Sequence, residues 1–257
     1  MLPAERHRRI SAAVDQAGTI STEALVEQLN VSAETIRRDL ALMERRGLLS
    51  RVRGGAASLA VVRGISGEEA SFTERSASQV EAKAAIGRAA AALVRPGMTL
   101  VIDVGTTAVQ VARALPPDFR GTVATPSLLV AAEASVLPQV EVLVPGGRVR
   151  QGDLACHGPA TVAFFSGLHA DLAFLGSGAI DAESGVTDFH FDEVATKQRI
   201  LAHSARSYVL ADTSKQDRLA THRVCGFHEC TGVITDTPPE TALASAIERA
   251  GCAVIVA

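Results

Sequence analysis

Apolar and polar residues among the first 57 positions follow the spacing of short amphipathic helices. Ser21 is a residue type that caps helices, and Leu25 and Leu29 follow it one turn apart on one helix face. Asn30 tolerates the left-handed conformation that often ends a helix. The pattern therefore predicts a helix between Ser21 and Asn30, preceded by another helix over residues 5–17.

A second amphipathic pattern follows after one tight corner. Ser32 is the expected cap, and Ile36, Leu40 and Met43 have the spacing that places them on one buried helix face. Two helices joined by so short a turn, with arginines along the second, are typical of a helix-turn-helix that binds double-stranded DNA. The outer face of the second helix carries Thr35, Arg37, Arg38 and Arg45.

The next stretch, residues 48–53, predicts a small β-ribbon before a Gly-Gly pair. Arg51 and Arg53 alternate with Val52, so a period of two points both arginines away from the core. Basic side chains on a ribbon suit DNA phosphates or the minor groove. The alternative is an ordinary helical hairpin with solvated arginines. The expected DNA contacts are Ser21, Thr22, Ser32, Ala33, Glu34, Thr35, Arg37, Arg38, Arg45, Arg51 and Arg53.

The segment VSAETIRRDLALMERRGLLSRVRGGA resembles the signature of the DeoR-type winged helix-turn-helix, which extends over about residues 3–57. This family contains bacterial repressors of sugar metabolism. The resemblance implies a DNA-binding transcriptional repressor of a sugar or carbohydrate catabolic operon. Operators are commonly repeated half-sites, so a homodimer or homotetramer is expected.

From about residue 79 the pattern changes to helices that alternate with short apolar strands. Strands at this spacing, joined by helical crossovers, predict the α/β class with a mostly parallel sheet that is covered on both faces. Small and polar residues between the two patterns predict a linker with little structure of its own. The expected domains are residues 1–57, 58–77 (the linker) and 78–257. The predicted strands are residues 99–104, 123–125, 140–145, 170–176, 207–212, 232–236 and 252–257.

The second pattern resembles the DeoR-type sensor domain over about residues 78–236. The matching stretches are IDVGTT, LVPGG, DLAFLGSGAID, SGVTDFHFDEVATKQ, VLADTSK and GVITD. The resemblance implies the sugar-phosphate isomerase and CoA-transferase type of fold, and an effector that is a phosphorylated sugar or a related intermediate. One departure is Pro126, where the family usually has Asn, because proline lacks both the amide side chain and the backbone donor.

Strand ends of the predicted sheet carry the candidate effector contacts, since ligands collect there in open α/β folds. Asp103 ends one strand, and Gly105 lets backbone N–H groups approach an anion at the start of the next helix. Thr106 and Thr107 add hydroxyl groups, so this turn predicts a phosphate site, whereas the alternative is a plain capped turn. The other expected effector contacts, most of them implied by the resemblance, are Thr125, Ser127, Gly147, Asp192, Glu193, Lys197 and Lys215.

Lysine is rare in this chain, which has three lysines against 22 arginines. Lys197 and Lys215 lie at predicted loop or helix-start positions, where a lysine suits a phosphate or a carboxylate. Lys197 also follows Glu193 by one helical turn, so the alternative at that position is a surface ion pair.

Charge and composition limit the class of protein. The net charge is −3, but residues 1–57 hold nine arginines against seven acidic residues, a balance of +2 that leaves −5 for the remaining 200. This asymmetry supports a basic head on an acidic body. No signal-peptide pattern and no apolar run of membrane-spanning length occur, so we expect a cytoplasmic protein without a membrane partner. No cofactor is expected.

Two other functions compete with an effector-responsive repressor. His222, Cys225, His228 and Cys230 form a dense cluster of zinc-ligand types, which favours a metal-responsive repressor. Their spacing matches no familiar zinc motif, and the four cysteines of the chain lack CxxC spacing. The second alternative is an isomerase with Glu193 as the base, although an isomerase has no use for a DNA-binding head. We expect no enzyme activity and no metal.

Overall fold

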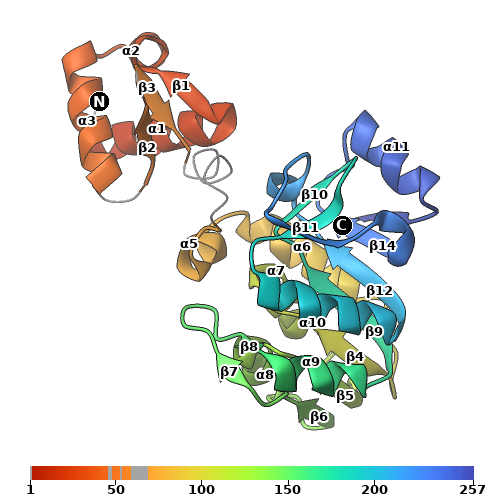
Figure 1. The fold of residues 1–257 in the computed structure, drawn as a ribbon. Helices are drawn as coiled ribbons and strands as arrows, with labels where there is room; N and C mark the ends of the chain where they lie inside the picture. Colours follow the sequence, from red (N-terminus) through yellow and green to blue (C-terminus); the bar gives the residue numbers. More distant parts are fainter. Residues whose placement is uncertain (1, 46–47, 53, 59–68) are drawn as a thin grey trace. The chain divides into compact units, whose positions relative to one another are not determined.

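A computed structural model of the 257-residue chain describes residues 2–45, 48–52, 54–58 and 69–257. The chain divides into two compact units, Met1–Ala70 and Ser71–Ala257 (Figure 1). The first unit contains the predicted helix-turn-helix and the second the predicted α/β sheet.

Three helices of the N-terminal unit follow the predicted pattern, namely α1 (Pro3–Ala17), α2 (Thr22–Leu29) and α3 (Ala33–Arg45). The Ser21 hydroxyl caps α2 by accepting from the Ala24 N–H at 3.1 Å, and Asn30 ends the helix at a φ of 50°. The Ser32 hydroxyl accepts from the Thr35 N–H at 3.3 Å at the start of α3. The predicted caps are therefore confirmed.

A three-stranded antiparallel sheet completes this unit in the order β1-β3-β2, with β1 at Thr19–Ser21, β2 at Ser50–Val52 and β3 at Gly55–Ala57. The sequence pattern predicted the ribbon but not β1, which is only three residues long. Gly55 is required where β3 pairs with β1, because a Cβ at this position would lie 2.1 Å from the Ile20 carbonyl oxygen. Val52 is 39% exposed, so it does not turn toward the core as the period of two predicted.

The core of the N-terminal unit buries the apolar stripes of all three helices. Asp39, 7% exposed, ties α3 to α1 because it accepts from Arg6 at 2.5 and 3.1 Å and lies 2.9 Å from the His7 ring. A buried carboxylate with charged partners fixes the angle between the two helices. The core residues are Ile10, Val14, Ile20, Leu25, Leu29, Ile36, Leu40, Met43, Leu49 and Ala56.

The C-terminal unit is built on a seven-stranded sheet in the order β15-β14-β12-β9-β4-β5-β6, and every neighbouring pair is parallel. Each of the seven predicted strands lies in it. This confirms the α/β class and the mostly parallel sheet. The strands are β4 (Thr99–Ile102), β5 (Gly121–Ala124), β6 (Val140–Leu143), β9 (Ala170–Gly176), β12 (Ser204–Leu210), β14 (Gly232–Thr235) and β15 (Ala253–Val256).

Helices cover both faces of this sheet (Figure 1). On one face α6 (Val80–Ala91), α7 (Thr106–Ala114) and α8 (Leu128–Ala134) bury alternate strand residues such as Ile102 and Phe174. The intervening residues, such as Val101 and Val209, pack under helices of the other face. Those helices are α9 (Pro159–Ser166), α10 (Phe191–Ala202) and α11 (Thr241–Arg249).

Several elements of the C-terminal unit lie where the sequence pattern predicted linker or loop. Phe72–Ala77 forms a helix, α5, whose first turn is held by a capping box between Ser71 and Glu74. A small antiparallel sheet joins β10 (Ala179–Asp181), β11 (Gly185–Asp188) and β13 (His222–Cys225). These pieces are short, so their apolar pattern is too weak to see. A hairpin of β7 (Arg148–Val149) and β8 (Cys156–His157) was also missed.

The order of strands reverses direction between β4 and β9. From β4 the chain adds β5 and β6 on one side, and from β9 it adds β12, β14 and β15 on the other. Crevices at such switch points, beyond the carboxyl ends of the strands, are where α/β sheets bind ligands. The segments that follow β4, β9 and β12 therefore contain the candidate effector site.

Candidate functional site

The predicted DNA-binding arginines lie on the surface of the N-terminal unit. Arg37, Arg38, Arg45 and Arg51 are all exposed. Arg38 forms an i,i+4 ion pair with Glu34 at 3.0 Å, whereas within the described part of the chain Arg37 has no ion-pair partner. Arg37, like Arg45 at the end of α3, is thus more available to a nucleic acid than Arg38.

Other predicted DNA contacts divide between the start of α3 and the ends of other elements. Ser32 is exposed, and its hydroxyl lies 2.9 Å from that of Thr35, which is half-buried like the neighbouring Ala33. Thr22 is only 6% exposed, and the Ser21 hydroxyl is engaged in capping α2. The Arg51 N–H donates to Glu44 of α3 at 3.1 Å, which attaches the ribbon to the helix. Arg53 lies outside the described residues.

A buried ionic cluster fills the switch point between β4 and β9. Lys197, 1% exposed, directs its Nζ to Asp103, to the Gly176 carbonyl oxygen at 3.0 Å and to Asp188 at 3.4 Å. These three acceptors use all three donors of an ammonium group. Burial acts to lower the pKa of Lys197, but the charges of Asp103, Asp188 and Glu193 outweigh it and raise that pKa. The charge of Lys197 is therefore compensated by carboxylates of this chain, and all three of its N–H donors already have acceptors.

Glu193 connects this cluster to the β7–β8 hairpin. Its Oε2 lies 3.8 Å from the Lys197 Nζ, and its Oε1 accepts from Arg150, which also pairs with Asp153. Burial and the charge of Asp188 raise the pKa of Glu193 to about 7, although Lys197 and Arg150 oppose the shift. The predicted contacts Asp103, Glu193 and Lys197 are thus brought together, as partners of one another. The sequence pattern did not point to Asp188, Arg150 or Asp153.

Of four further predicted contacts, Thr125, Ser127 and Asp192 have hydrogen-bond or ion-pair partners, and Gly147 is closely packed. Thr125 is fully buried and accepts from the Ser127 N–H at 3.0 Å, and the Ser127 hydroxyl accepts from the Val130 N–H at 3.2 Å to cap α8. A Cβ at Gly147 would lie 2.7 Å from the His157 carbonyl oxygen. Asp192 pairs with the His157 ring at 3.1 Å while its side chain stays 61% exposed. These residues lie on one side of the switch point.

The turn after β4 has the expected form of an anion site. Gly105 has a φ of 115°, no side chain caps the N-terminus of α7, and a Cβ at Gly105 would meet only open space. Thr106 is buried at this N-terminus and Thr107 is half-buried. The first N–H groups of an uncapped helix, together with the helix dipole, favour an anion.

A second lysine, Lys83, which is not among the predicted effector contacts, lies close to this turn. Lys83 of α6 is 4% exposed, and its Nζ donates to the Arg75 carbonyl oxygen and to the Ser78 carbonyl oxygen at 2.7 Å. Burial lowers the pKa of Lys83 to about 8, the charge of Asp212 opposes this, and the charges of Lys215 and Arg75 add to it. Lys83 is therefore a buried ammonium group that is held by neutral acceptors.

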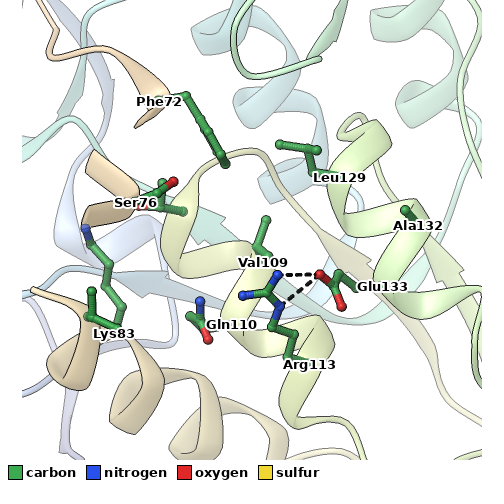
Figure 2. A pocket seen from close by; sticks show the side chains of 11 residues that line it. Phe72, Ser76, Lys83, Val109, Gln110, Arg113, Leu129, Ala132 and Glu133 are labelled. Atoms are coloured by element: carbon green, nitrogen blue, oxygen red, sulfur yellow. Dashed lines mark hydrogen bonds and ion pairs between the residues drawn. The ribbon is translucent and has the colours of Figure 1, made fainter. Parts of the chain in front are cut away.

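A groove of about 300 Å³ runs along this face, between α5, α6, α7 and α8. Lys83 and Thr106 both line it, so the groove begins beside the turn after β4. Figure 2 shows Lys83 on one side of the groove and the Arg113–Glu133 ion pair further along it, beneath Phe72 and Leu129. The apolar part of the walls comes from Phe72, Val80, Val109, Leu129 and Ala132, and Gln110 lies between Lys83 and the ion pair.

The Cys/His cluster of the metal hypothesis is dispersed. Cys225 and Cys230 are buried in the apolar core under α11. The His222 ring makes an edge-to-face contact with Phe191 at 5.6 Å between centroids, and the His228 side chain is 69% exposed. The Cys230 and Cys252 sulfur atoms are 3.6 Å apart, and hydrogen bonding with Cys225 raises the pKa of Cys230 to about 12. No group of three or more metal-ligand side chains occurs in the described part of the chain.

Comparison with known proteins follows the division into two units. Residues 6–61 match the DeoR-like helix-turn-helix domain, and residues 78–237 match the DeoR C terminal sensor domain. The chain belongs to the DeoR family. The HTH-type transcriptional regulator GlpR of Haloferax volcanii is 34% identical over 257 residues, which cover 99% of this chain and 98% of that protein. The glycerol-3-phosphate regulon repressor of Escherichia coli is 35% identical over 239 residues, 93% of each chain.

The DeoR match confirms the prediction of a DNA-binding transcriptional repressor with a separate sensor domain. Among solved structures, ribose 5-phosphate isomerase A of Methanocaldococcus jannaschii covers 54% of this chain and 55% of its own at a TM-score of 0.41 and 16% identity. In the part of the chain that the structure describes, no helix is both long and apolar enough to cross a membrane.

Proposed function

We propose that this DeoR-family repressor leaves its operator when a small phosphorylated polyol or sugar binds at the carboxyl edge of the C-terminal sheet. The observation that supports this most directly is the uncapped N-terminus of α7, with the buried Lys83 lining the same groove as Thr106. Two cations and a set of helix N–H groups are complementary to a phosphate. The phosphate site that we propose therefore consists of Gly105, Thr106, Thr107, Lys83 and Lys215.

The ionic cluster has a different part in this proposal. Lys197 donates to Asp103, Asp188 and a carbonyl, so a ligand phosphate would have to displace carboxylates from it. We propose that Asp103, Glu193 and Lys197 shape the floor of the site and that Asp192 and the β7–β8 hairpin flank it. An isomerase needs a base that reaches the substrate, but Glu193 is held by Arg150. We propose no catalytic activity.

Glycerol 3-phosphate is the first ligand to test, because the E. coli relative is named as the repressor of that regulon. The experiment is a thermal unfolding series of the full-length protein with glycerol 3-phosphate, other sugar phosphates, glycerol, inorganic phosphate and zinc. A stabilisation by one phosphate ester that its free polyol does not produce supports the site. If zinc alone stabilises the protein, the effector is a metal ion and this proposal is wrong.

On the DNA side, we propose that Arg37 contacts the operator in the major groove and that Ser32, Thr35 and Arg38 contact the DNA next to Arg37. We propose that Arg51 and Arg53 are the DNA contacts of the β-ribbon. Arg37→Ala should weaken operator binding by about 1–3 kcal/mol, measured as a binding isotherm with labelled DNA. Arg120→Ala, which removes an exposed arginine of the C-terminal unit, is the matched control. Equal operator affinity of the Arg37→Ala protein and the control would remove this placement of α3.

Operator half-sites are commonly repeated, so we propose a cytoplasmic homodimer or homotetramer as the active form. Its mass in solution, measured by native mass spectrometry with and without operator DNA, distinguishes the two. A monomer bound to DNA would contradict both.

A further inference from the structure

Lys83 forms hydrogen bonds to the C-terminal end of α5, the first helix of the C-terminal unit. The Nζ of Lys83 donates to the carbonyl oxygens of Arg75 and Ser78, and it lies 3.4 Å from the Ser78 hydroxyl. Arg75 and Ser78 lie in the last turn and at the C-cap of α5, a helix of six residues. So short a helix is not stable alone, so these bonds are a large part of what keeps its last turn in place.

The three acceptors of Lys83 also use the whole donor capacity of its ammonium group. An anion in the groove beside Lys83 can be bound only if at least one α5 acceptor is given up. Hydrogen bonds from a cation to an anion are roughly twice as strong as bonds to neutral groups, so a phosphate competes well with two carbonyl oxygens. The bonds of Lys83 to α5 are therefore open to exchange.

A buried carboxylate whose charge acts on Lys83 favours the same exchange. Asp212, 1% exposed, follows β12, and its Oδ1 accepts from the Ser214 N–H at 3.0 Å. Its Oδ2 is buried and has no hydrogen-bond partner. The Asp212 oxygen lacks a hydrogen-bond donor while the Lys83 ammonium group bonds only neutral oxygens, so a hydrogen bond between the two would favour release of Lys83 from α5.

We propose that Lys83 is a switch residue that exchanges the C-terminal end of α5 for the phosphate of the effector and the Asp212 carboxylate. This inference rests on the proposed phosphate site and adds its route of regulation. Effector binding then releases the last turn of α5. Because Ser71 begins the C-terminal unit, α5 is the first element after the boundary with the DNA-binding unit. Its release is the step that carries effector occupancy toward the operator.

The test is hydrogen exchange of full-length protein, followed by mass spectrometry of peptides that cover α5 and the N-terminus of α7. The probes are glycerol 3-phosphate and inorganic phosphate, with glycerol as the control. We expect the α7 amides to become protected, while the α5 amides exchange about tenfold faster, which corresponds to the loss of one or two net hydrogen bonds. No variant is needed for this comparison, so a folding defect cannot obscure it.

Two lysine variants then separate the switch from binding alone. Lys83→Gln should exchange its α5 amides fast without ligand, and ligand should change them no further. Lys215→Gln is the matched control, since it removes a cation of the proposed site and leaves the bonds of Lys83 to α5 in place. It should keep α5 protected without ligand and need more ligand to release it.

The outcomes distinguish the switch from the site. If a phosphate protects the α7 amides while exchange in α5 is unchanged or slower, the proposed switch role of Lys83 is wrong and the proposed phosphate site stands. Slow α5 exchange in Lys83→Gln also overturns it. If neither phosphate alters exchange at α7, the proposed effector site fails, and the release step fails with it.

Discussion

Two buried lysines at the same edge of the sheet have opposite surroundings. Lys197 is 1% exposed and has carboxylate acceptors, whereas Lys83 is 4% exposed and has only carbonyl and hydroxyl acceptors. The charges around Lys197 raise its pKa, while burial lowers that of Lys83 to about 8. A buried lysine marks a ligand site when its own chain leaves the charge uncompensated, and it marks a structural centre when carboxylates compensate it.

The largest expected effect follows from removing Lys197. Lys197→Met leaves Asp103 and Asp188 buried without their cation, so the C-terminal unit should lose about 3–5 kcal/mol of stability. Lys83→Met leaves only neutral carbonyls unpartnered near the end of a short helix, and should cost at most about 1.5 kcal/mol. The single tyrosine, Tyr208, lies buried in β12 and the chain has no tryptophan. Tyrosine fluorescence during urea unfolding therefore reports on this unit alone. Equal losses in the two variants would contradict the comparison.

The strands of the C-terminal unit show which elements the sequence pattern can predict. The seven strands of the sheet were predicted because each is a short apolar run between turns, which periodicity detects. Strands β10 and β11 were not, since three or four residues with polar members carry no such signal. Their position is set by the core beneath them, where Ile180 and Val186 are buried.

Side-chain partners across the sheet were harder to predict than the residues themselves. Asp103 and Lys197 were both singled out from their strand-end and helix-start positions, but their ion pair joins residues 94 positions apart. Lys83 carried no chemical signal in the sequence because the groove that it lines is built from α5, α6, α7 and α8, which come together only in the fold. One sequence without an alignment cannot show which distant residues meet. The fold supplied that information, and it separated the two lysines.

A second prediction concerns Glu193, at the outer side of the paired cluster. Its pKa is raised to about 7, mainly by burial, so its contribution to stability is fully present below its unfolded pKa and is lost as pH rises through 7. Glu193→Gln does not titrate. Between pH 5 and pH 8 the stability of the variant relative to wild type should therefore increase by about 1–3 kcal/mol, measured by urea unfolding at both values.

The matched control for this titration is Glu183→Gln, on an exposed residue of the same unit. Its stability relative to wild type should stay nearly constant over the same interval. If the Glu193→Gln difference is also constant, Glu193 is ionised in the folded protein throughout and the ionic cluster is tighter than burial implies.

The smallest expected effect concerns Lys83, the lysine with neutral acceptors, and the pH dependence of phosphate binding. With a pKa of about 8, Lys83 is mostly charged at pH 7 and loses its proton as pH rises above 8. A phosphate ester is already largely dianionic at pH 7, since its second pKa is about 6. The affinity for a phosphate ligand that binds wild type should then be level near pH 7 and fall by up to about tenfold for each pH unit above 8.

Lys83→Arg separates this titration from every other group at the site. Arginine stays charged throughout the range, so a variant that still binds phosphate should lose the decline above pH 8, whatever its absolute affinity. Lys215→Gln should keep the decline, because Lys83 is intact. Titration calorimetry at pH 7, 8 and 9 measures all three proteins. A decline that persists in Lys83→Arg would place the titrating group elsewhere, and Lys83 would then resemble Lys197 as a structural lysine rather than differ from it.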